Sequence, residues 1–288
     1  MPPSYLQDPG SARRLLARGD AAPPSFVGMT ELCAWLDGHL GGADWRSATV
    51  PYNPAKVVIR PKYYDGYINR VVVTLDGRVC TCGYWDSFLT APGAGVHRTT
   101  FAPVPFELGP GVAYPTITQV EQSYQAAYAL DSLGRVWAWG TNNYGQLGDG
   151  TTTARRTARL IQFFVSNAMT VHEIVPSVDS QGSEVGCFFI ASSSTVTCGV
   201  WYVGRNANGE AGCGNATAQS TPVRCGTLQN VTTLWAERQP TGAAVFAKVG
   251  SALYAWGVNN YGCLGLGSGN TCLLYTSPSP RDRQKSRM

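Results

Sequence analysis

The chain has 288 residues, of which 14% are charged and 11% aromatic, with 33 glycines. This length can bury one large core or two ordinary ones. The formal net charge of +4 is concentrated in residues 277–288, which hold four basic residues and one acidic residue. The rest of the chain is nearly neutral and lacks the basic stripe that nucleic-acid binding requires, so we expect no nucleic-acid partner.

The composition favours a turn-rich all-β protein. Aromatic and β-branched residues suit half-buried pleated strands, and glycine supplies tight connections between them. No apolar run is long enough to span a bilayer, and the first residues lack the apolar stretch of a signal peptide. We therefore expect no membrane span and a cytoplasmic location, with an assembly- or surface-associated location as the alternative.

The cysteines are odd in number and thinly spread. This pattern favours small buried side chains in a reducing compartment over a disulfide framework, which is usually denser. The nine residues are Cys33, Cys80, Cys82, Cys187, Cys198, Cys213, Cys225, Cys263 and Cys272.

The beginning of the chain predicts little regular structure. We interpret residues 1–25, which mix Pro, Gly, Ala and Arg, as a disordered leader. Residues 26–55 form a short helical or irregular segment, in which Thr30 caps a helix that ends at Gly41-Gly42. The apolar positions at helical spacing in this helix are Leu32, Trp35, Leu36 and Leu40.

From residue 56 onward the chain predicts repeated β-hairpins. Self-similarity at a period of several tens of residues indicates a repeat architecture. The glycines that close the return strands are Gly83, Gly140, Gly204 and Gly257, which are 57, 64 and 53 residues apart. The paired runs are 71–73 with 78–83 around Asp76-Gly77, 127–130 with 135–140, 188–191 with a run reaching 204, and 244–248 with 252–257. Further strands are expected at 159–164, 171–175, 222–225 and 231–235.

Each period thus holds about four strands, enough for one antiparallel sheet. Four-stranded sheets repeated at this spacing predict a β-propeller, in which sheets stand radially and bury their faces against neighbours. The alternative is a pair of β-sandwiches, which the regular recurrence of a W-G-x-N-x-x-G pattern disfavours.

The residues after each return strand carry a specific resemblance. The second copy reads WGTNNYGQLGDG over 139–150, which resembles the signature of the regulator of chromosome condensation repeat. The fourth copy keeps most of the pattern, and the third has Val203 and Ala211 in place of tryptophan and leucine. The first copy keeps the hairpin and Gly83, but its loop has lost the regular glycine spacing. The resemblance covers about residues 70–270 and implies a propeller, typically of seven blades. About four blades are expected here, in an incomplete or open propeller.

The repeated residues have structural explanations. Tryptophans fill the wedge-shaped gaps between blades, asparagine side chains satisfy loop backbone groups, and glycines turn the loop through positive φ. The tryptophans are Trp137, Trp139, Trp201 and Trp256, and the asparagines are Asn142, Asn206 and Asn259. Replacing Gly145 by Val is expected to cost on the order of 1–3 kcal/mol if its φ is positive.

The end of the chain departs from the pattern. We expect residues 56–271 to form the propeller repeats and residues 272–288 to be a disordered tail. This tail resembles translated adapter DNA, so we interpret it as non-native and the protein as a fragment.

We identify no catalytic, cofactor-binding or metal-binding residue. The three histidines, His39, His97 and His172, lie in unrelated contexts, and the pair Cys80 and Cys82 lacks further ligands. Asp131 and Asp149 are interpreted as loop residues of the repeat. The glycine-rich loops lead to strands rather than helices, so they lack the geometry of a phosphate site. We expect neither an enzyme nor a cofactor.

Three functions follow as hypotheses. The first is a non-catalytic scaffold that binds another protein, of unknown identity, through loops that differ between copies, namely 86–101 and 151–159. The second is a structural component of a bacterial, phage or cell-surface assembly. The third, implied by the resemblance, is a guanine nucleotide exchange factor-like regulator of a small GTPase, although no exchange residue can be matched. The partner-binding residues are unknown at this stage.

Overall fold

The computed structural model describes residues 70–73, 77–83, 98–123, 126–178, 184–259, 262–264 and 272–276. Among these residues the regular structure is almost entirely β-strand, with one short helix. The predicted leader (1–25) and the helix expected within 26–55 lie outside the described residues.

The strands are β1 (Arg70–Val73), β2 (Val79–Gly83), β3 (Arg98–Pro103), β4 (Ile117–Gln122), β5 (Ala126–Asp131), β6 (Val136–Gly140), β7 (Arg155–Leu160), β8 (Thr170–Val178), β9 (Glu184–Ser192), β10 (Gly199–Gly204), β11 (Gln219–Arg224), β12 (Val231–Gln239), β13 (Gly242–Val249), β14 (Ala252–Gly257) and β15 (Cys272–Thr276). The helix is α3 (Gln162–Ser166).

The strands form separate sheets in chain order, β1-β2-β3, β4-β5-β6-β7, β8-β9-β10-β11 and β12-β13-β14-β15, which we call blades 1 to 4. Every pairing inside a blade is antiparallel. The predicted all-β architecture of four-stranded antiparallel blades is confirmed. Within the described residues, blade 1 has three strands.

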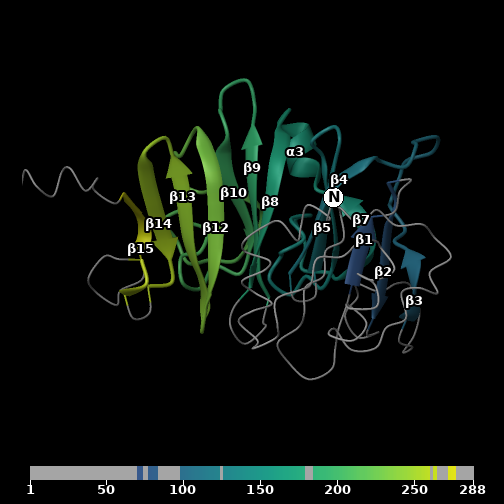
Figure 1. Cartoon of the computed structure of the whole chain (residues 1–288), viewed down its shortest axis with the longest axis horizontal. Helices are drawn as coiled ribbons and strands as arrows, with labels where there is room; N and C mark the ends of the chain where they lie inside the picture. Colours follow the sequence, from purple (N-terminus) through teal and green to yellow (C-terminus); the bar gives the residue numbers. More distant parts are fainter. Residues whose placement is uncertain are drawn as a thin grey trace, which may run out of the picture.

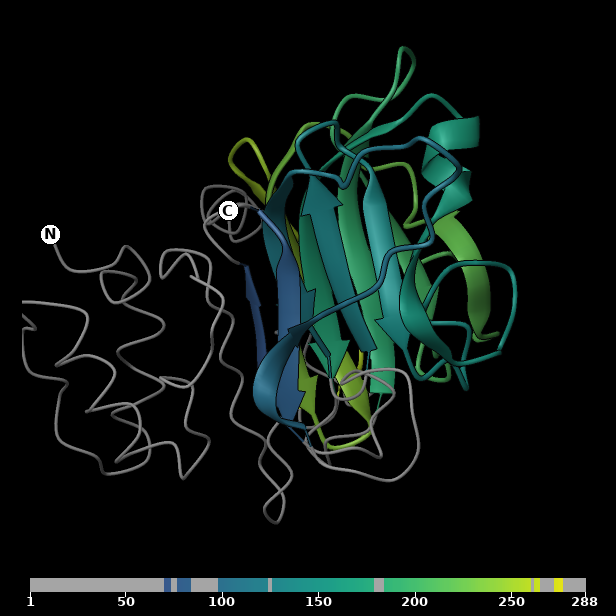
Figure 2. The same ribbon diagram turned by 90° about the vertical axis from the view of Figure 1, so that its right-hand side faces the viewer.

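The blades are arranged about their first strands. β1 contacts β4, β4 contacts β8, and β8 contacts β12, so the first strand of each blade lies innermost, as in a propeller. Figure 1 shows the blades side by side as an open fan, with β15 at one end and β3 at the other. Figure 2 shows the same fan from the side of blade 1, with α3 near the upper ends of the strands.

The middle strands of blades 2 and 3 are apolar along most of their length because both faces of these blades are covered. In β5, Tyr128 and Leu130 face blade 3, whereas Ala127 and Ala129 face blade 1. Successive side chains of a strand point to opposite faces. A strand covered on both sides therefore shows a continuous apolar run rather than an alternating one.

The tryptophans occupy the gaps between blades, as predicted. Trp137 and Trp139 lie in the core between blades 1 and 2, Trp201 in the core between blades 2 and 3, and Trp256 in the core between blades 3 and 4. All four are almost completely buried.

Two predicted segments differ in the structure. The run 159–164 was expected to be one strand, but β7 ends at Leu160 and α3 follows. The apolar residues of this run, Ile161 and Phe164, fill the core between blades 2 and 3 from a helical turn. The expected disorder from residue 272 is wrong for Cys272–Thr276, because β15 pairs with β14 as the outer strand of blade 4.

Candidate functional site

The loop that follows β6 is held together by one buried asparagine. The side-chain oxygen of Asn142 accepts a hydrogen bond from the Leu147 amide at 2.9 Å, and its side-chain nitrogen donates to the carbonyls of Thr151 and Thr153 at 3.0 and 3.1 Å. Asn142 is fully buried. Its side chain therefore satisfies backbone groups that the loop itself leaves unpaired.

The same geometry recurs in blade 3. Asn206 accepts from the Ala211 amide at 2.8 Å and donates to the carbonyls of Asn215 and Thr217 at 2.9 and 3.1 Å. In blade 4, Asn259 accepts from the Leu264 amide at 3.0 Å. The predicted role of these asparagines is confirmed.

Each of these repeat loops (141–154 in blade 2 and 205–218 in blade 3) packs against the next blade. Gly145 has φ +76°, and a Cβ built there would lie 2.4 Å from the Cα of Ser220 in β11. The Gly150 amide donates to the Ser220 carbonyl at 2.9 Å. One blade further, the Trp256 indole donates to the Glu210 carbonyl at 2.8 Å. The repeat loops therefore join consecutive blades.

Blade 3 carries a buried carboxylate at this joint. Glu210 accepts hydrogen bonds from the backbone amide and side-chain nitrogen of Asn208, at 2.8 and 3.1 Å. Burial raises the pKa of the Glu210 carboxyl, and these hydrogen bonds offset the increase only in part. Blade 2 has the neutral Gln146 at the equivalent position, where it accepts from the Tyr144 amide at 2.9 Å.

Asp131 and Asp149 lie at opposite ends of β6, and each is satisfied locally. Asp131 accepts from the Leu133 and Arg135 amides, the Arg135 side chain at 2.7 Å and the Trp137 indole at 3.1 Å. These contacts close the hairpin between β5 and β6.

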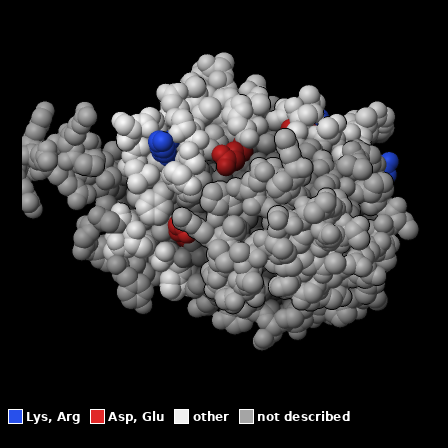
Figure 3. Space-filling model, viewed as in Figure 1, with Lys and Arg blue, Asp and Glu red and all other residues white. Residues whose placement is uncertain are grey.

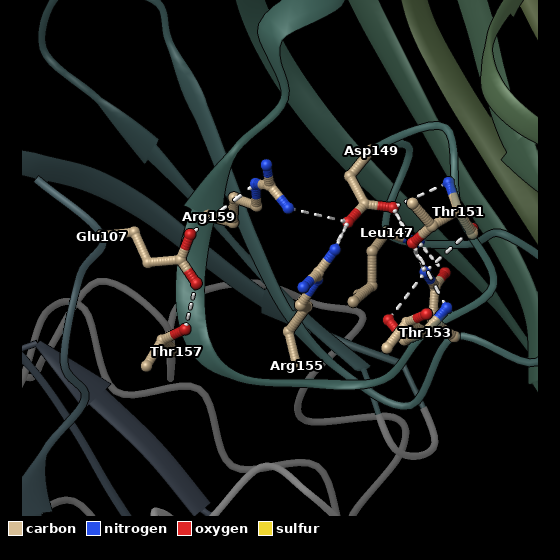
Figure 4. A network of polar contacts seen from close by, with 9 residues as sticks. Glu107, Leu147, Asp149, Thr151, Thr153, Arg155, Thr157 and Arg159 are labelled. Atoms are coloured by element: carbon tan, nitrogen blue, oxygen red, sulfur yellow. Dashed lines mark hydrogen bonds and ion pairs between the residues drawn. The ribbon is translucent and has the colours of Figure 1, made fainter.

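Asp149 belongs to a polar network shown in Figure 4. It accepts from Thr151 at 2.7 Å and from Arg155 at 2.9 and 3.0 Å. Burial alone would raise the pKa of the Asp149 carboxyl, but the hydrogen bonds from Thr151 and Arg155 and the charge of Arg155 together lower it. Farther along β7, Thr157 donates to Glu107 at 2.6 Å.

The outer edge of β7 is covered by the segment that leaves blade 1. The Glu107 amide donates to the Ala158 carbonyl at 2.9 Å, and the Ala158 amide donates to the Pro105 carbonyl at 2.8 Å. Phe106 packs against Trp137 with ring centroids 5.2 Å apart. This segment therefore satisfies backbone groups that an edge strand would otherwise expose.

A groove opens where this segment passes the hairpin end of blade 2. It has a volume of about 390 Å³ and is open to solvent. We call it the hairpin-end groove. Its principal lining residues are Glu107, Leu108, Val112, Arg135, Trp137 and Arg159, and Gln162 of α3 also contributes.

Comparison with known protein families identifies the repeats in this chain. Residues 134–175 and 251–284 match the model of the regulator of chromosome condensation (RCC1) repeat, and residues 117–146 match a second model with the same description. The chain carries RCC1 repeats. The matches begin in blade 2 and recur in blade 4, where the glycine loops are best preserved.

Curated relatives match part of the chain. The E3 ubiquitin-protein ligase HERC2 of Homo sapiens is 35% identical over 92 residues, which cover 32% of this chain and 2% of that protein. The RCC1-like G exchanging factor-like protein of Mus musculus is 28% identical over 231 residues, which cover 75% of this chain and 46% of the relative. The chain therefore spans less than half of either relative.

Solved structures support the fold. Human WBSCR16 matches with a TM-score of 0.52 at 19% identity, over 77% of this chain and 55% of that one. Prp20p from Saccharomyces cerevisiae matches with a TM-score of 0.58 at 19% identity, over 78% and 51%. At this identity the likeness concerns the propeller fold alone.

The residues singled out from the sequence fall into two groups, those of the repeat signature and those of the loops expected to bind a partner. The tryptophans and asparagines of the signature are buried, as are Gly145 and Gly148, whereas Gly150 and Gly214 are exposed. Of the two loops expected to bind a partner, 151–159 lies beside the Asp149 network, whereas residues 86–97 of the other lie outside the described residues.

The residues considered for metal or redox chemistry are dispersed. His172 lies exposed on β8, 2.6 Å from the Ser192 hydroxyl, while His39 and His97 lie outside the described residues. In the described part of the chain, no group of three or more His, Cys, Asp or Glu side chains has a metal-binding arrangement. Nor does any helix there have the length and apolar character needed to cross a membrane.

Sequence reasoning missed the hairpin-end groove. Its residues come from the segment after β3, the hairpin of blade 2, the end of β7 and the start of α3. Those of the segment after β3 lie outside the stretches that match the repeat models. The connections between blades that build the groove, 104–116 and 161–169, are longer than the corresponding connection 225–230.

Proposed function

We propose that this RCC1-repeat protein is a non-catalytic scaffold that binds another protein through surface residues outside the repeat signature. One observation carries the proposal. The signature tryptophans and asparagines are buried, whereas the exposed side chains of Val112, Arg159 and Glu107 line a groove between blade 2 and the segment that leaves blade 1. Binding residues commonly lie on variable segments that a rigid scaffold positions.

The surface charge agrees with a protein partner. The face in Figure 3 shows isolated basic and acidic side chains among the described residues, not a continuous basic patch. Binding that depends on phosphate contacts weakens steeply as salt rises. A protein partner held through apolar contacts is expected to remain bound.

The test is affinity capture with the full chain at low and high salt, followed by reconstitution with the purified captured protein. We expect a complex of defined stoichiometry on size-exclusion chromatography that survives the high-salt wash. Recovery of nucleic acid in place of protein, or a captured protein that forms no complex when purified, would contradict the proposal.

A second candidate function is regulation of a small GTPase by nucleotide exchange. The observation that favours it is the match of 75% of this chain to an RCC1-like G exchanging factor-like protein. The solved Prp20p structure is described with its binding properties to Gsp1p and histones. Accelerated release of a fluorescent guanine nucleotide from a small GTPase on addition of this chain would establish this function, and unchanged release across a panel of small GTPases would exclude it for that panel.

The structural role in a bacterial, phage or cell-surface assembly stays a prediction. Co-purification with particles or envelope would support it.

A further inference from the structure

We propose that the hairpin-end groove binds an extended segment of a partner protein, with an acidic side chain held by Arg135 and Arg159 and flanking apolar side chains packed on Val112, Leu133 and Val165. This inference rests on the proposed scaffold function and assigns it a site and a ligand class.

Arg135 is held in place while its terminal amino groups stay available. Its Nε donates to Asp131 at 2.7 Å, and its guanidinium lies 5.6 Å from the centroid of the Trp137 ring. Among the described residues, no hydrogen bond uses its terminal nitrogens. A guanidinium fixed by stacking and one hydrogen bond is pre-organised to bind a carboxylate with its remaining donors.

Arg159 is held only by long ion pairs. Its contacts with Glu107 and Asp149 are 3.7 and 3.8 Å long, beyond hydrogen-bond distance. The Asp149 carboxylate is already occupied by Thr151 and Arg155, and Glu107 by Thr157. Since 45% of the Arg159 side chain is exposed, an incoming carboxylate can reach it.

Three exposed apolar side chains, which we call the rim, come from the segments that form the groove. Val112 lines the groove, Leu133 lies in the blade 2 hairpin and Val165 lies on α3. Leu133 is 69% exposed, Val112 48% and Val165 42%, and they are among the few large apolar side chains that the described residues expose to this extent. Exposed apolar side chains beside a polar centre are typical of a protein-binding surface.

Backbone contacts bring the three rim segments together. The Ser132 amide donates to the Thr116 carbonyl at 2.8 Å, and the Val171 amide donates to the Gly134 carbonyl at 2.9 Å. The first contact joins the hairpin tip to the segment of Val112, and the second joins it to the chain that follows α3. Figures 1 and 2 both show α3 at the hairpin end of the blades.

The charges favour an acidic peptide over a nucleic acid. Arg159 stands next to Glu107 and Asp149, and Arg135 stands next to Asp131, so a chain of successive phosphates would meet carboxylates on either side. A single carboxylate between apolar side chains meets less of that repulsion. Opposite charge at the centre and apolar contact at the rim therefore select one class of partner.

The test uses fluorescein-labelled synthetic peptides with Asp or Glu between Leu, Ile or Val residues. Matched sets carry Asn or Gln, or Lys, at the central position. Fluorescence anisotropy with the full chain is expected to show binding by the acidic set, with an affinity lower by about tenfold for the amide set and no binding by the Lys set. Equal binding of the acidic and amide sets, or no binding by any acidic peptide, would overturn the proposal.

Two surface variants and two controls locate the site. Arg159→Gln and Leu133→Ser are each expected to weaken binding by about tenfold, and Arg159→Lys by less, because lysine keeps the charge but loses the planar fork. Arg224→Gln is the matched control, since Arg224 lies 6.0 Å over the Trp201 ring of blade 3. Leu253→Ser is the second control, at a leucine of blade 4 that is 40% exposed.

The controls should bind like wild type. Arg159→Gln, Leu133→Ser and Leu253→Ser replace exposed side chains and should keep the wild-type unfolding midpoint, whereas Arg224→Gln also loses a hydrogen bond to the Leu228 carbonyl and is assayed well below its own midpoint. Equal weakening by the blade 3 or blade 4 controls would contradict this assignment. Binding of the captured partner distinguishes failure of this inference from failure of the scaffold function. If Arg159→Gln and Leu133→Ser bind that partner as wild type does, the assignment of the binding site to the groove is wrong and the scaffold function stands. If no protein forms a complex with the chain, the scaffold function fails as well.

Discussion

The buried asparagines of the repeat loops are the clearest case in which one side chain replaces missing backbone pairing. Asn142 makes hydrogen bonds to one amide and two carbonyls inside a loop that folds against the next blade. Leaving a buried polar group unpaired costs about 1–3 kcal/mol. The stability of the blade joint therefore depends on this residue.

We predict that Asn142→Ala lowers the free energy of unfolding by at least about 2 kcal/mol, because one donor and two acceptors lose their partner. The measurement is urea-induced unfolding followed by tryptophan fluorescence. The neighbouring Asn143 is exposed, so Asn143→Ala should change stability by less than about 0.5 kcal/mol. Similar losses for both variants would show that the side-chain network contributes little.

Glu210 gives a prediction for pH. Burial raises the pKa of its carboxyl in the folded state, so the folded protein binds a proton more tightly than the unfolded chain does. The associated stability is present at low pH and is lost as pH rises through the raised pKa. We expect Glu210→Gln to raise the unfolding midpoint near neutral pH and to have little effect in acid.

The measurement for Glu210 is thermal unfolding between about pH 4 and pH 8, compared with wild type at each pH. Gln146→Glu places a carboxyl at the equivalent position in blade 2 and should have the opposite effect. A Glu210→Gln variant that is destabilised at neutral pH would contradict the account, because the charge would then be stabilising.

At the scale of elements, the repeat loop is the part that determines how blades meet. Gly145 and Gly150 lie in the same loop with φ +76° and +80°. A Cβ at Gly145 would lie 2.4 Å from the Cα of Ser220, whereas at Gly150 the nearest atom is the Thr221 methyl at 3.8 Å. The two positions share backbone strain and differ in the contact with blade 3.

Both Gly145→Ala and Gly150→Ala should therefore lose about 1–3 kcal/mol from the positive φ. Gly145→Ala should lose at least about 1 kcal/mol more, because blade 3 must move to admit the methyl group. Chemical unfolding of both variants measures the difference. Equal losses would mean that the positive φ alone explains the need for glycine at position 145. They would also mean that blade 3 moves at little cost to admit the methyl group.

Much of this element structure could be predicted from the sequence. Four hairpins, their closing glycines and the roles of Trp139 and Asn142 follow from turn chemistry and recurrence. The helix α3 could not be predicted, because it has only five residues. Its apolar side chains are those that a buried strand would also have. β15 was missed because pairing with β14 depends on a partner strand rather than on the local sequence.

At the scale of the whole molecule, the signature residues hold the blades together and exposed residues outside the signature form its surface. The hairpin-end groove could not be predicted, because its lining residues Val112, Arg135 and Arg159 are far apart in the sequence and come together only where blade 2 packs against the segment that leaves blade 1. The repeat pattern correctly identifies what holds the fold together. It gives no information about which exposed side chains cluster.

The central claim is that joining blades and binding a partner depend on different residues. The most direct test measures peptide affinity, well below the unfolding temperature, for Asn206→Ala in the blade 3 loop and for the double variant Leu133→Ser, Arg159→Gln. We predict that Asn206→Ala binds the acidic peptides as wild type does although it unfolds at a lower temperature. The double variant should lose binding by more than about tenfold with an unchanged unfolding midpoint. Wild-type affinity in the double variant, or lost affinity in folded Asn206→Ala, would contradict the account.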